Sequence, residues 1–172
     1  MADLDVMAII HVINLYGLAM DTQRWDLFDH IFTSDVEADF GDPSHWRDLA
    51  TFKSDFAAFH GPLDSTQHTM SNHLVHVEGE LAQAFCYGGW RLIRRGIEGG
   101  ELWEGTGWYD DDLVRSQGGW LIKRRTCRVV WWSGNPLVHE TAPGVKFSLR
   151  STVLRREADA GKVRFLKALV RS

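Results

Sequence analysis

The chain has 172 residues, of which 44% are apolar and 24% charged, and its formal net charge is −4. These values are typical of one globular domain with a substantial core. They give no support for nucleic-acid binding. No uncharged apolar run approaches the roughly 20 residues of a membrane span, and no signal peptide is recognisable. We therefore expect a cytoplasmic protein without membrane association, in which Cys86 and Cys127 are free, buried thiols.

Three helices are predicted in the N-terminal third of the chain. Residues 4–20 carry apolar side chains at helical spacing, and Asp21 follows where a second helix, ending near residue 32, would begin. Asp21 could simply cap that second helix. Residues 36–40 alternate like a short strand, and Ser44 is the candidate N-cap of a third helix that ends near residue 60.

From residue 66 onward the hydrophobic pattern changes to a period of two. It predicts four long strands, at residues 66–78, 81–95, 101–114 and 119–132, joined by short hairpin turns. Strands of this length must curl, and Gly88, Gly89, Gly105 and Gly107 are candidate bend points. We therefore expect an α+β cone in which three N-terminal helices cover a curled antiparallel sheet and enclose a pocket.

The C-terminal part of the chain differs in charge from the rest. Residues 146–172 contain eight lysines and arginines against two acidic residues. We expect a main domain over residues 1–135 and a basic extension over residues 136–172 that acts as a lid or as a contact with a neighbouring subunit. Two short helices are predicted there, at residues 148–159 and 162–171.

Three short motifs stand out along this pattern: Tyr16-Gly-Leu-Ala-Met-Asp21, Gln67-His68 through Asn72, and Gly119-Trp120 through Arg125. With the order of elements, they resemble the SnoaL-like branch of the nuclear transport factor 2-like superfamily. That branch includes scytalone dehydratase, bile-acid 7α-dehydratase and hexachlorocyclohexane dehydrochlorinase. The resemblance implies that Asp21 and His68 form a catalytic dyad, that Tyr16 lies beside it, and that Arg125 contacts the substrate or the leaving group. It also implies a homotrimer or homodimer.

The chemistry of these residue types agrees with that implication. A neutral histidine is a suitable general base near neutral pH, and a buried carboxylate would fix its tautomer and stabilise the cation. Arg125 would stabilise a developing oxyanion or leaving hydroxide. Tyr16 could protonate a departing hydroxyl group or hold a phenol, and Asn72 could orient the substrate. Each has a structural alternative: His68 as a hydrogen-bonded core residue, and Asn72 as a hydrogen-bonding residue at the end of the sheet.

Eight tryptophans and nine phenylalanines favour a pocket for a flat, apolar or aromatic substrate. Besides Asn72, the candidate substrate-binding residues are Phe40, Phe56, Tyr87, Trp90 and Trp108. The histidines lack HxxxH and HxH spacing, and no Cys–His cluster is present, so we predict no metal site and no other cofactor. The acidic run 110–112 is expected to be solvated near a turn.

Three functions remain open at this point. The first is a cofactor-independent, dehydratase-like lyase that removes water or another small group, including by retro-aldol carbon–carbon cleavage, from a small aromatic or polycyclic hydroxylated compound. The second is an isomerase or cyclase on the same fold. The third is a non-catalytic protein that binds a small molecule or serves as a partner subunit.

Overall fold

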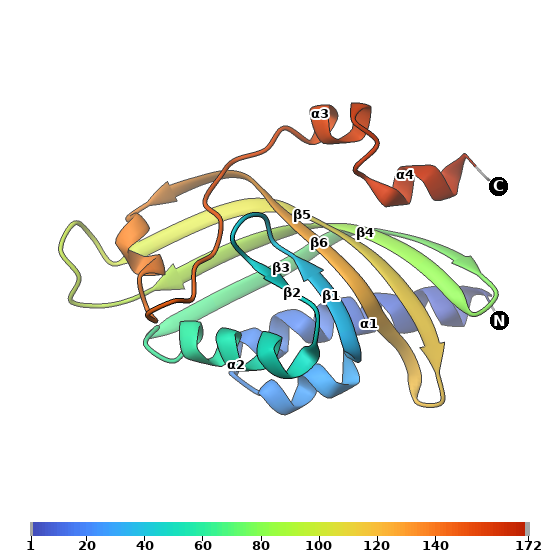
Figure 1. Ribbon diagram of the computed structural model, residues 1–172, viewed down its shortest axis with the longest axis horizontal. Coiled ribbons are helices and arrows are strands. Elements are labelled where there is room, and N and C mark those ends of the chain that lie inside the picture. The colour runs from blue at the N-terminus through green and yellow to red at the C-terminus, as the bar shows by residue number, and fades with distance from the viewer. Residues whose placement is uncertain (1, 171–172) are drawn as a thin grey trace.

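The structure, a computed structural model, describes residues 2–170 (Figure 1). Three helical segments lie before residue 61, as predicted: α1 (Ala2–Asp21), the 3-10 helix η1 (Trp25–His30) and α2 (Leu49–His60). The prediction that Ser44 caps the third helix was wrong. The Asp48 side chain caps α2 by accepting a hydrogen bond from the Thr51 N–H at 2.7 Å. The preceding residues form a short strand, β2 (His45–Trp46).

One curled sheet runs through the described part of the chain, in the strand order β2–β1–β6–β5–β4–β3. Besides β2, its strands are β1 (Phe32–Asp39), β3 (Ser65–Glu78), β4 (Leu81–Ile93), β5 (Leu102–Ser116) and β6 (Gly119–Gly134). Strands β3 to β6 pair in antiparallel fashion as consecutive hairpins, whereas β1 pairs in parallel with β6. No tight turn joins β1 to β6, so their relative direction is not restricted to antiparallel. The predicted α+β fold with a curled sheet is confirmed, and the sheet is mixed at this edge.

The helices and the C-terminal segment lie on opposite faces of this sheet. Figure 1 shows α1 and α2 on one face and the C-terminal helices α3 (Leu154–Asp159) and α4 (Arg164–Leu169) on the other. Register shifts between Ser71 and Leu74 and between Thr106 and Gly107 interrupt the long strands. Such irregularities bend a strand and increase its twist. The second shift adjoins a glycine that was predicted as a bend point.

Helix α1 packs directly on β3 at Gly17. A Cβ atom at this position would lie 3.2 Å from the main-chain oxygen of His68, which is closer than ordinary van der Waals contact. Glycine therefore allows the helix to approach the strand closely. One turn later, α1 ends at Asp21 beside the beginning of β3.

Helix α1 is also long and apolar enough, by length and composition, to cross a membrane over Asp3–Asp21. The search for long apolar runs in the sequence did not detect this helix as a possible membrane span. Apolar core helices meet the same criterion, and Ile9 and Ile13 of α1 are fully buried within the domain. In this fold, α1 serves as the helix that covers the pocket side of the sheet.

The C-terminal extension begins with a 3-10 helix, η2 (Pro136–His139), and then crosses to the outer face of the sheet (Figure 1). There Phe165 and Val163 pack with Phe85 and Trp108. Both predicted helices of the extension are present, but each is shorter than expected because Ser148–Val153 lie outside helices and α4 begins only at Arg164. The extension thus packs on its own chain.

The acidic run on β5 is not solvated near a turn, so that prediction was wrong. Asp110 and Asp111 are both buried, and they point to opposite faces of the sheet as strand neighbours must. Asp110 accepts hydrogen bonds from the main-chain N–H groups of Arg164 and Phe165. Asp111 pairs with Arg125 on the inner side. Both carboxylates therefore have specific structural partners.

Candidate active site

A small, mainly aromatic cavity of about 70 Å³ lies between the helices and the concave face of the sheet. Its aromatic lining includes Phe40, Phe56, Phe59, Trp90, Trp103 and Phe147. Three histidines, His60, His68 and His139, add polar atoms to the lining. An apolar cavity with a few polar groups is the usual form of a small-molecule site.

The Asp21–His68 dyad is formed, with its histidine at the cavity wall. Asp21 Oδ1 lies 2.7 Å from His68 Nδ1, and Asp21 Oδ2 accepts the main-chain N–H of His68 at 2.8 Å. Thr66 Oγ1 donates a third hydrogen bond to Asp21 Oδ1 at 2.8 Å. The His68 side chain is only 6% exposed. The end of α1 and the beginning of β3 thus hold the imidazole in one orientation.

These contacts determine the protonation of the dyad. Burial disfavours the charged form of Asp21, but the hydrogen bonds from His68 outweigh burial and hold the pKa of Asp21 below its ordinary value. An ionised carboxylate only accepts hydrogen bonds, so His68 Nδ1 carries the ring proton of the neutral imidazole. The lone pair is then on Nε2, the nitrogen that Asp21 leaves free. The alternative role of Asp21 as a helix cap is not found, because Arg24 is the N-cap residue of η1.

The other two cavity histidines were not predicted as site residues. Burial, together with the nearby His68, lowers the pKa of His60 to about 3. His60 Nδ1 lies 2.8 Å from the carbonyl oxygen of Phe56, which fixes it as the protonated nitrogen. Burial lowers the pKa of His139 to about 4. Both rings are therefore neutral near pH 7. His60 follows Phe56 by one helical turn on the same apolar face, which is a usable sequence signal, whereas His139 lies in the extension and has no such pattern.

Arg125 points inward, as expected, but does not reach the cavity lining. It is fully buried and forms two hydrogen bonds with Asp111, at 2.9 and 2.7 Å. Its guanidinium lies 4.3 Å from the centre of the Tyr16 ring and 4.6 Å from that of Tyr109. Tyr16 and Tyr109 do line the cavity. The expectation that Arg125 contacts substrate or leaving group is thus corrected: its charge is paired beneath two tyrosines.

Tyr16 lies at the cavity as the resemblance implied. Its side chain is 1% exposed, and burial raises the pKa of its hydroxyl well above the ordinary value. The group therefore stays a neutral phenol. Among the aromatic candidates, Phe40, Phe56 and Trp90 also line the cavity.

Three candidate substrate-binding residues lie outside the cavity lining. Tyr87 is 42% exposed, and Trp108 is buried against Phe85 on the outer face of the sheet. Side chains alternate between the two faces of a strand, and Tyr109, which directly follows Trp108, points inward. Trp108 therefore points outward, and so does its cross-strand neighbour Tyr87.

Asn72 is the third. It is exposed and has a positive φ of 54° at the irregular part of β3. This irregularity breaks the period-two relation with His68 on which its predicted role depended.

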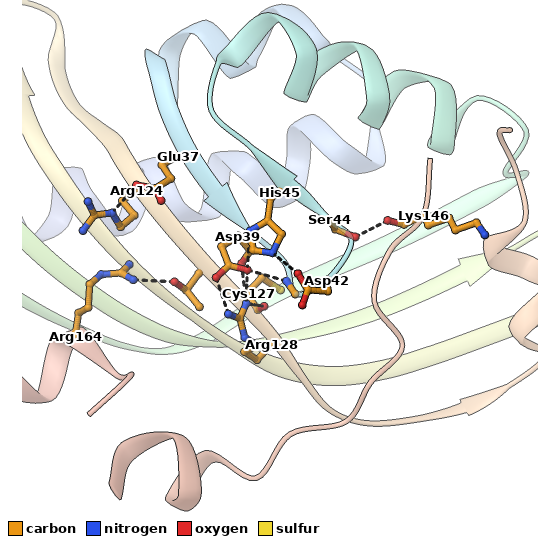
Figure 2. Close-up of polar contacts among 12 residues, drawn as sticks. Glu37, Asp39, Asp42, Ser44, His45, Arg124, Cys127, Arg128, Lys146 and Arg164 are labelled. Carbon is orange, nitrogen blue, oxygen red and sulfur yellow. Dashed lines mark hydrogen bonds and ion pairs between the residues drawn. The ribbon is translucent and has the colours of Figure 1, made fainter. Parts of the chain in front are cut away.

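A second, polar hollow adjoins the aromatic cavity and shares Phe40 and Ser148 with it. Figure 2 shows its inner polar contacts, in which Arg128 of β6 binds Asp39 of β1 at 2.6 Å. Ser44 donates a hydrogen bond to the main-chain oxygen of Lys146, which ties the extension to the loop before β2. Arg128 and Asp39 are thus paired with each other at the edge of this hollow.

Within residues 2–170, no group of three histidine, cysteine, aspartate or glutamate side chains has an arrangement suited to a metal ion. Cys86 and Cys127 are free and buried, and burial raises the pKa of each thiol to about 12. Neither thiol is therefore activated as a nucleophile. The imidazole of His68 also lines the cavity, with its Nε2 left free by Asp21.

Residues 4–126 match the SnoaL-like domain family. The chain belongs to this family. An uncharacterized protein of Mycobacterium tuberculosis is 30% identical over 116 residues, which cover 64% of this chain and 75% of the relative. The predicted family membership is confirmed, and the extension beyond residue 126 lies outside the matched region.

Solved structures support the same fold. A scytalone-dehydratase-like protein from Novosphingobium aromaticivorans has a TM-score of 0.71 at 20% identity, over 84% of this chain and 98% of that protein. A nuclear transport factor 2-like superfamily protein from Salmonella enterica has a TM-score of 0.66 at 18% identity, over 86% of this chain and all of that protein. At these identities the likeness establishes the fold alone.

Proposed function

We propose that this SnoaL-like protein is a cofactor-independent, dehydratase-like lyase that acts on a small hydroxylated aromatic or alicyclic compound. The observation that carries the proposal is the Asp21–His68 dyad at the wall of an aromatic cavity. The similarity to a scytalone-dehydratase-like protein agrees with this reaction class. Fold alone does not determine chemistry, so the dyad and its cavity are the main support.

The proposed reaction uses His68 for both proton transfers. His68 Nε2 removes a proton from the carbon next to the one that bears the hydroxyl group, and Asp21 stabilises the resulting imidazolium. The imidazolium then gives that proton to the departing hydroxyl group, so that water leaves and a carbon–carbon double bond remains. Loss of another small group, including retro-aldol cleavage, would use the same base.

In this scheme Tyr16 is not the general acid that protonates the departing hydroxyl group. Because burial raises the pKa of its hydroxyl, a buried phenolate would be costly to form. Tyr16 therefore orients the substrate by hydrogen bonding and does not donate its proton. The dry aromatic wall strengthens the interaction between Asp21 and the imidazolium.

The volume of the cavity narrows the substrate class. A space of about 70 Å³ suits a single-ring compound better than a polycyclic one. Phe147 of the extension packs directly against Phe59 in the cavity wall, with ring centres 4.4 Å apart. A polycyclic substrate would require this segment to move, so we propose one-ring compounds as the first class to test.

An isomerase is the second candidate, and the placement of Arg125 favours it. Among the described residues that line the cavity, none is lysine or arginine, so the site offers no fixed cation to a leaving hydroxide. An isomerase moves a proton without releasing an anion and would need only the dyad.

The test is mass spectrometry of products after incubation with a panel of hydroxylated one-ring compounds. The native protein should give a product that has lost water or a carbon fragment. His68→Ala should reduce turnover by about 10²–10⁴-fold, the usual contribution of general acid–base catalysis. His76→Ala is the matched control, because His76 lies on the same strand outside the cavity lining.

The outcomes separate the candidate functions. A product of unchanged mass that requires His68 would indicate an isomerase. An active His68→Ala protein would refute both catalytic proposals. Retention of one compound without turnover by both proteins would indicate a binding protein.

We further propose that the protein works in the cytoplasm as a homodimer or homotrimer. Buried, reduced Cys86 and Cys127 agree with a reducing compartment. Exposed Leu4, Met7 and Leu18 on α1 agree with a contact between subunits. Light scattering of the purified protein would give its mass in solution, and a monomer would refute the assembly.

A further inference from the structure

The aromatic cavity has a second polar group, separate from the Asp21–His68 dyad. Trp103 of β5 and His139 of η2 both line the cavity, and their ring centres lie 4.3 Å apart in an edge-to-face arrangement. Trp103 is 2% exposed. Within residues 2–170, neither Trp103 Nε1 nor either ring nitrogen of His139 has a hydrogen-bond partner. Trp90 Nε1 in the same wall differs, since it donates a hydrogen bond to Tyr109 Oη at 2.8 Å.

The chain holds His139 in this place by several independent contacts. Asn135, just before η2, donates hydrogen bonds to the carbonyl oxygens of Glu98 and Gly100, at 2.9 and 2.7 Å. Arg94 donates to the carbonyl oxygen of Glu140, directly after His139, at 2.7 Å. Gly134, with φ of 96°, makes the preceding turn; a Cβ atom there would lie 2.2 Å from the Leu102 oxygen. The histidine is therefore anchored to the loop between β4 and β5.

Unpartnered buried polar atoms require an explanation. Each one costs about 1–3 kcal/mol when water is removed from it without a replacement. Apolar side chains of similar shape would avoid this cost at both positions. A ligand that supplied the missing hydrogen bonds would offset this cost.

The chemistry of the two side chains identifies the kind of ligand atom. Trp103 Nε1 can only donate, and neutral His139 offers one donor and one acceptor nitrogen. A hydroxyl group satisfies this pair, since its oxygen accepts from Trp103 while its hydrogen is donated to His139. A carboxylate fits less well, because no lysine or arginine is present among the described residues that line the cavity.

We propose that Trp103 and His139 form a recognition site for a hydroxyl group of the substrate, separate from the hydroxyl or proton that reacts at His68. This inference rests on the proposed function, because it treats the bound molecule as a substrate. The ligand would carry two oxygen substituents on one ring, one facing each polar group. His139 is then a specificity residue supplied by the C-terminal extension.

The test compares three ligands of similar shape: hydroquinone, p-cresol and p-xylene, with two, one and no hydroxyl groups. Binding constants are measured for the native protein, His139→Phe and Trp132→Phe. His139→Phe keeps a ring but removes both nitrogens. Trp132→Phe is the matched control, because Trp132 stacks near Trp103 but its N–H is already bonded to the Leu149 oxygen at 2.8 Å.

We expect the native protein to prefer hydroquinone over p-xylene by more than about tenfold, since each neutral hydrogen bond adds a severalfold preference. His139→Phe should lose at least about fivefold of this preference, and Trp132→Phe should keep it. In proton–nitrogen NMR spectra, the indole N–H signal of Trp103, assigned with Trp103→Phe, should shift downfield with hydroquinone and not with p-xylene.

An unchanged hydroxyl preference in His139→Phe, or an equal indole shift with both ligands, would overturn the proposal. Failure of the proposed function is distinguishable from this result. A protein that catalyses no reaction, but loses its hydroxyl preference in His139→Phe, would keep the recognition site and lose only the lyase assignment. A protein that needs His68 for turnover, but whose hydroxyl preference is unaffected by His139→Phe, would keep the lyase assignment and lose the recognition site.

Discussion

Asp21 holds His68 at two separate points, with Oδ1 on the imidazole Nδ1 and Oδ2 on the main-chain N–H of the same residue. A carboxylate that binds both the ring and the backbone fixes the side chain and the strand to each other. The two contacts together set the orientation of His68 Nε2. This arrangement sets the first prediction.

Asp21→Asn should reduce turnover by about 10²–10⁴-fold with a smaller loss of stability. The amide has one oxygen in place of two, so only one of the two N–H groups would keep its hydrogen-bond acceptor, and the NH₂ group can favour the wrong tautomer of His68. Nitrogen NMR of the His68 ring would show the tautomer directly. Thr66→Val, which removes only the third hydrogen bond to Asp21, is the control and should leave the tautomer unchanged.

The same dyad predicts a pH dependence of stability. The pKa of Asp21 is lower in the folded protein than in the unfolded chain, so its contribution to stability is present above the unfolded pKa of about 4. That contribution is lost as the pH falls through the lower folded value. Denaturant unfolding between pH 2 and 6 should therefore show a decline towards acid that is smaller in Asp21→Asn. An identical decline in both proteins would contradict this assignment.

Gly17→Ala should impair catalysis more than stability. Alanine gains up to about 1 kcal/mol in helix propensity, but its Cβ atom would press on the His68 main chain from 3.2 Å. A displaced dyad loses activity steeply with distance, so we expect a loss of about tenfold or more in turnover. Asn14→Ala is the control on the exposed side of α1. Equal activity of the two variants would show that α1 can shift without disturbing His68.

Arg125→Met should lower the free energy of unfolding by about 3–5 kcal/mol, because Asp111 would remain buried without its partner. The double variant Arg125→Met with Asp111→Leu should recover much of that loss. Denaturant unfolding gives both values. Turnover of the folded double variant should stay within about tenfold of native, since the pair lies beneath Tyr16 and Tyr109. A far larger loss of turnover in the stable double variant would indicate that Arg125 contacts the substrate directly.

Docking of the C-terminal helices should weaken as the pH rises through about 6. Burial raises the pKa of Asp110 to about 6, against the opposing effect of Arg164. A raised pKa means that the folded state binds the proton more tightly, so the associated stability is present below pH 4 and lost as the pH passes 6. Hydrogen exchange of residues 154–169 between pH 5 and 8, corrected for the intrinsic rate, measures it. A pH-independent opening equilibrium would contradict the prediction.

The fold could be predicted from hydrophobic periodicity, and the dyad from motif positions at the end of a helix and the beginning of a strand. Asn72 could not be placed correctly, because the irregularity in β3 that turns it outward leaves no sign in the alternation. Trp108 was assigned to the wrong face because adjacent Trp108 and Tyr109 are both large aromatic residues, and composition does not say which one points inward.

The charged residues show a second limit of sequence interpretation. Asp110 and Asp111 form part of an acidic run that looks solvated, and only the fold shows that each has its own buried partner. Arg125 was correctly expected to point inward, yet its pairing with Asp111 depends on cross-strand register. His139 follows an irregular segment without periodicity, so no local pattern could have placed it at the cavity.

The family domain ends at residue 126, but part of the cavity wall is built after it, by His139 and Phe147. In the proposed scheme the dyad lies inside the matched region, whereas the hydroxyl site combines Trp103 from within that region with His139 from beyond it. A relative with a different chain after β6 would keep the dyad at α1 and β3 but present a different wall to its ligand. A chain truncated after β6 would keep Asp21 and His68 but lose the part of the cavity wall that His139 and Phe147 form.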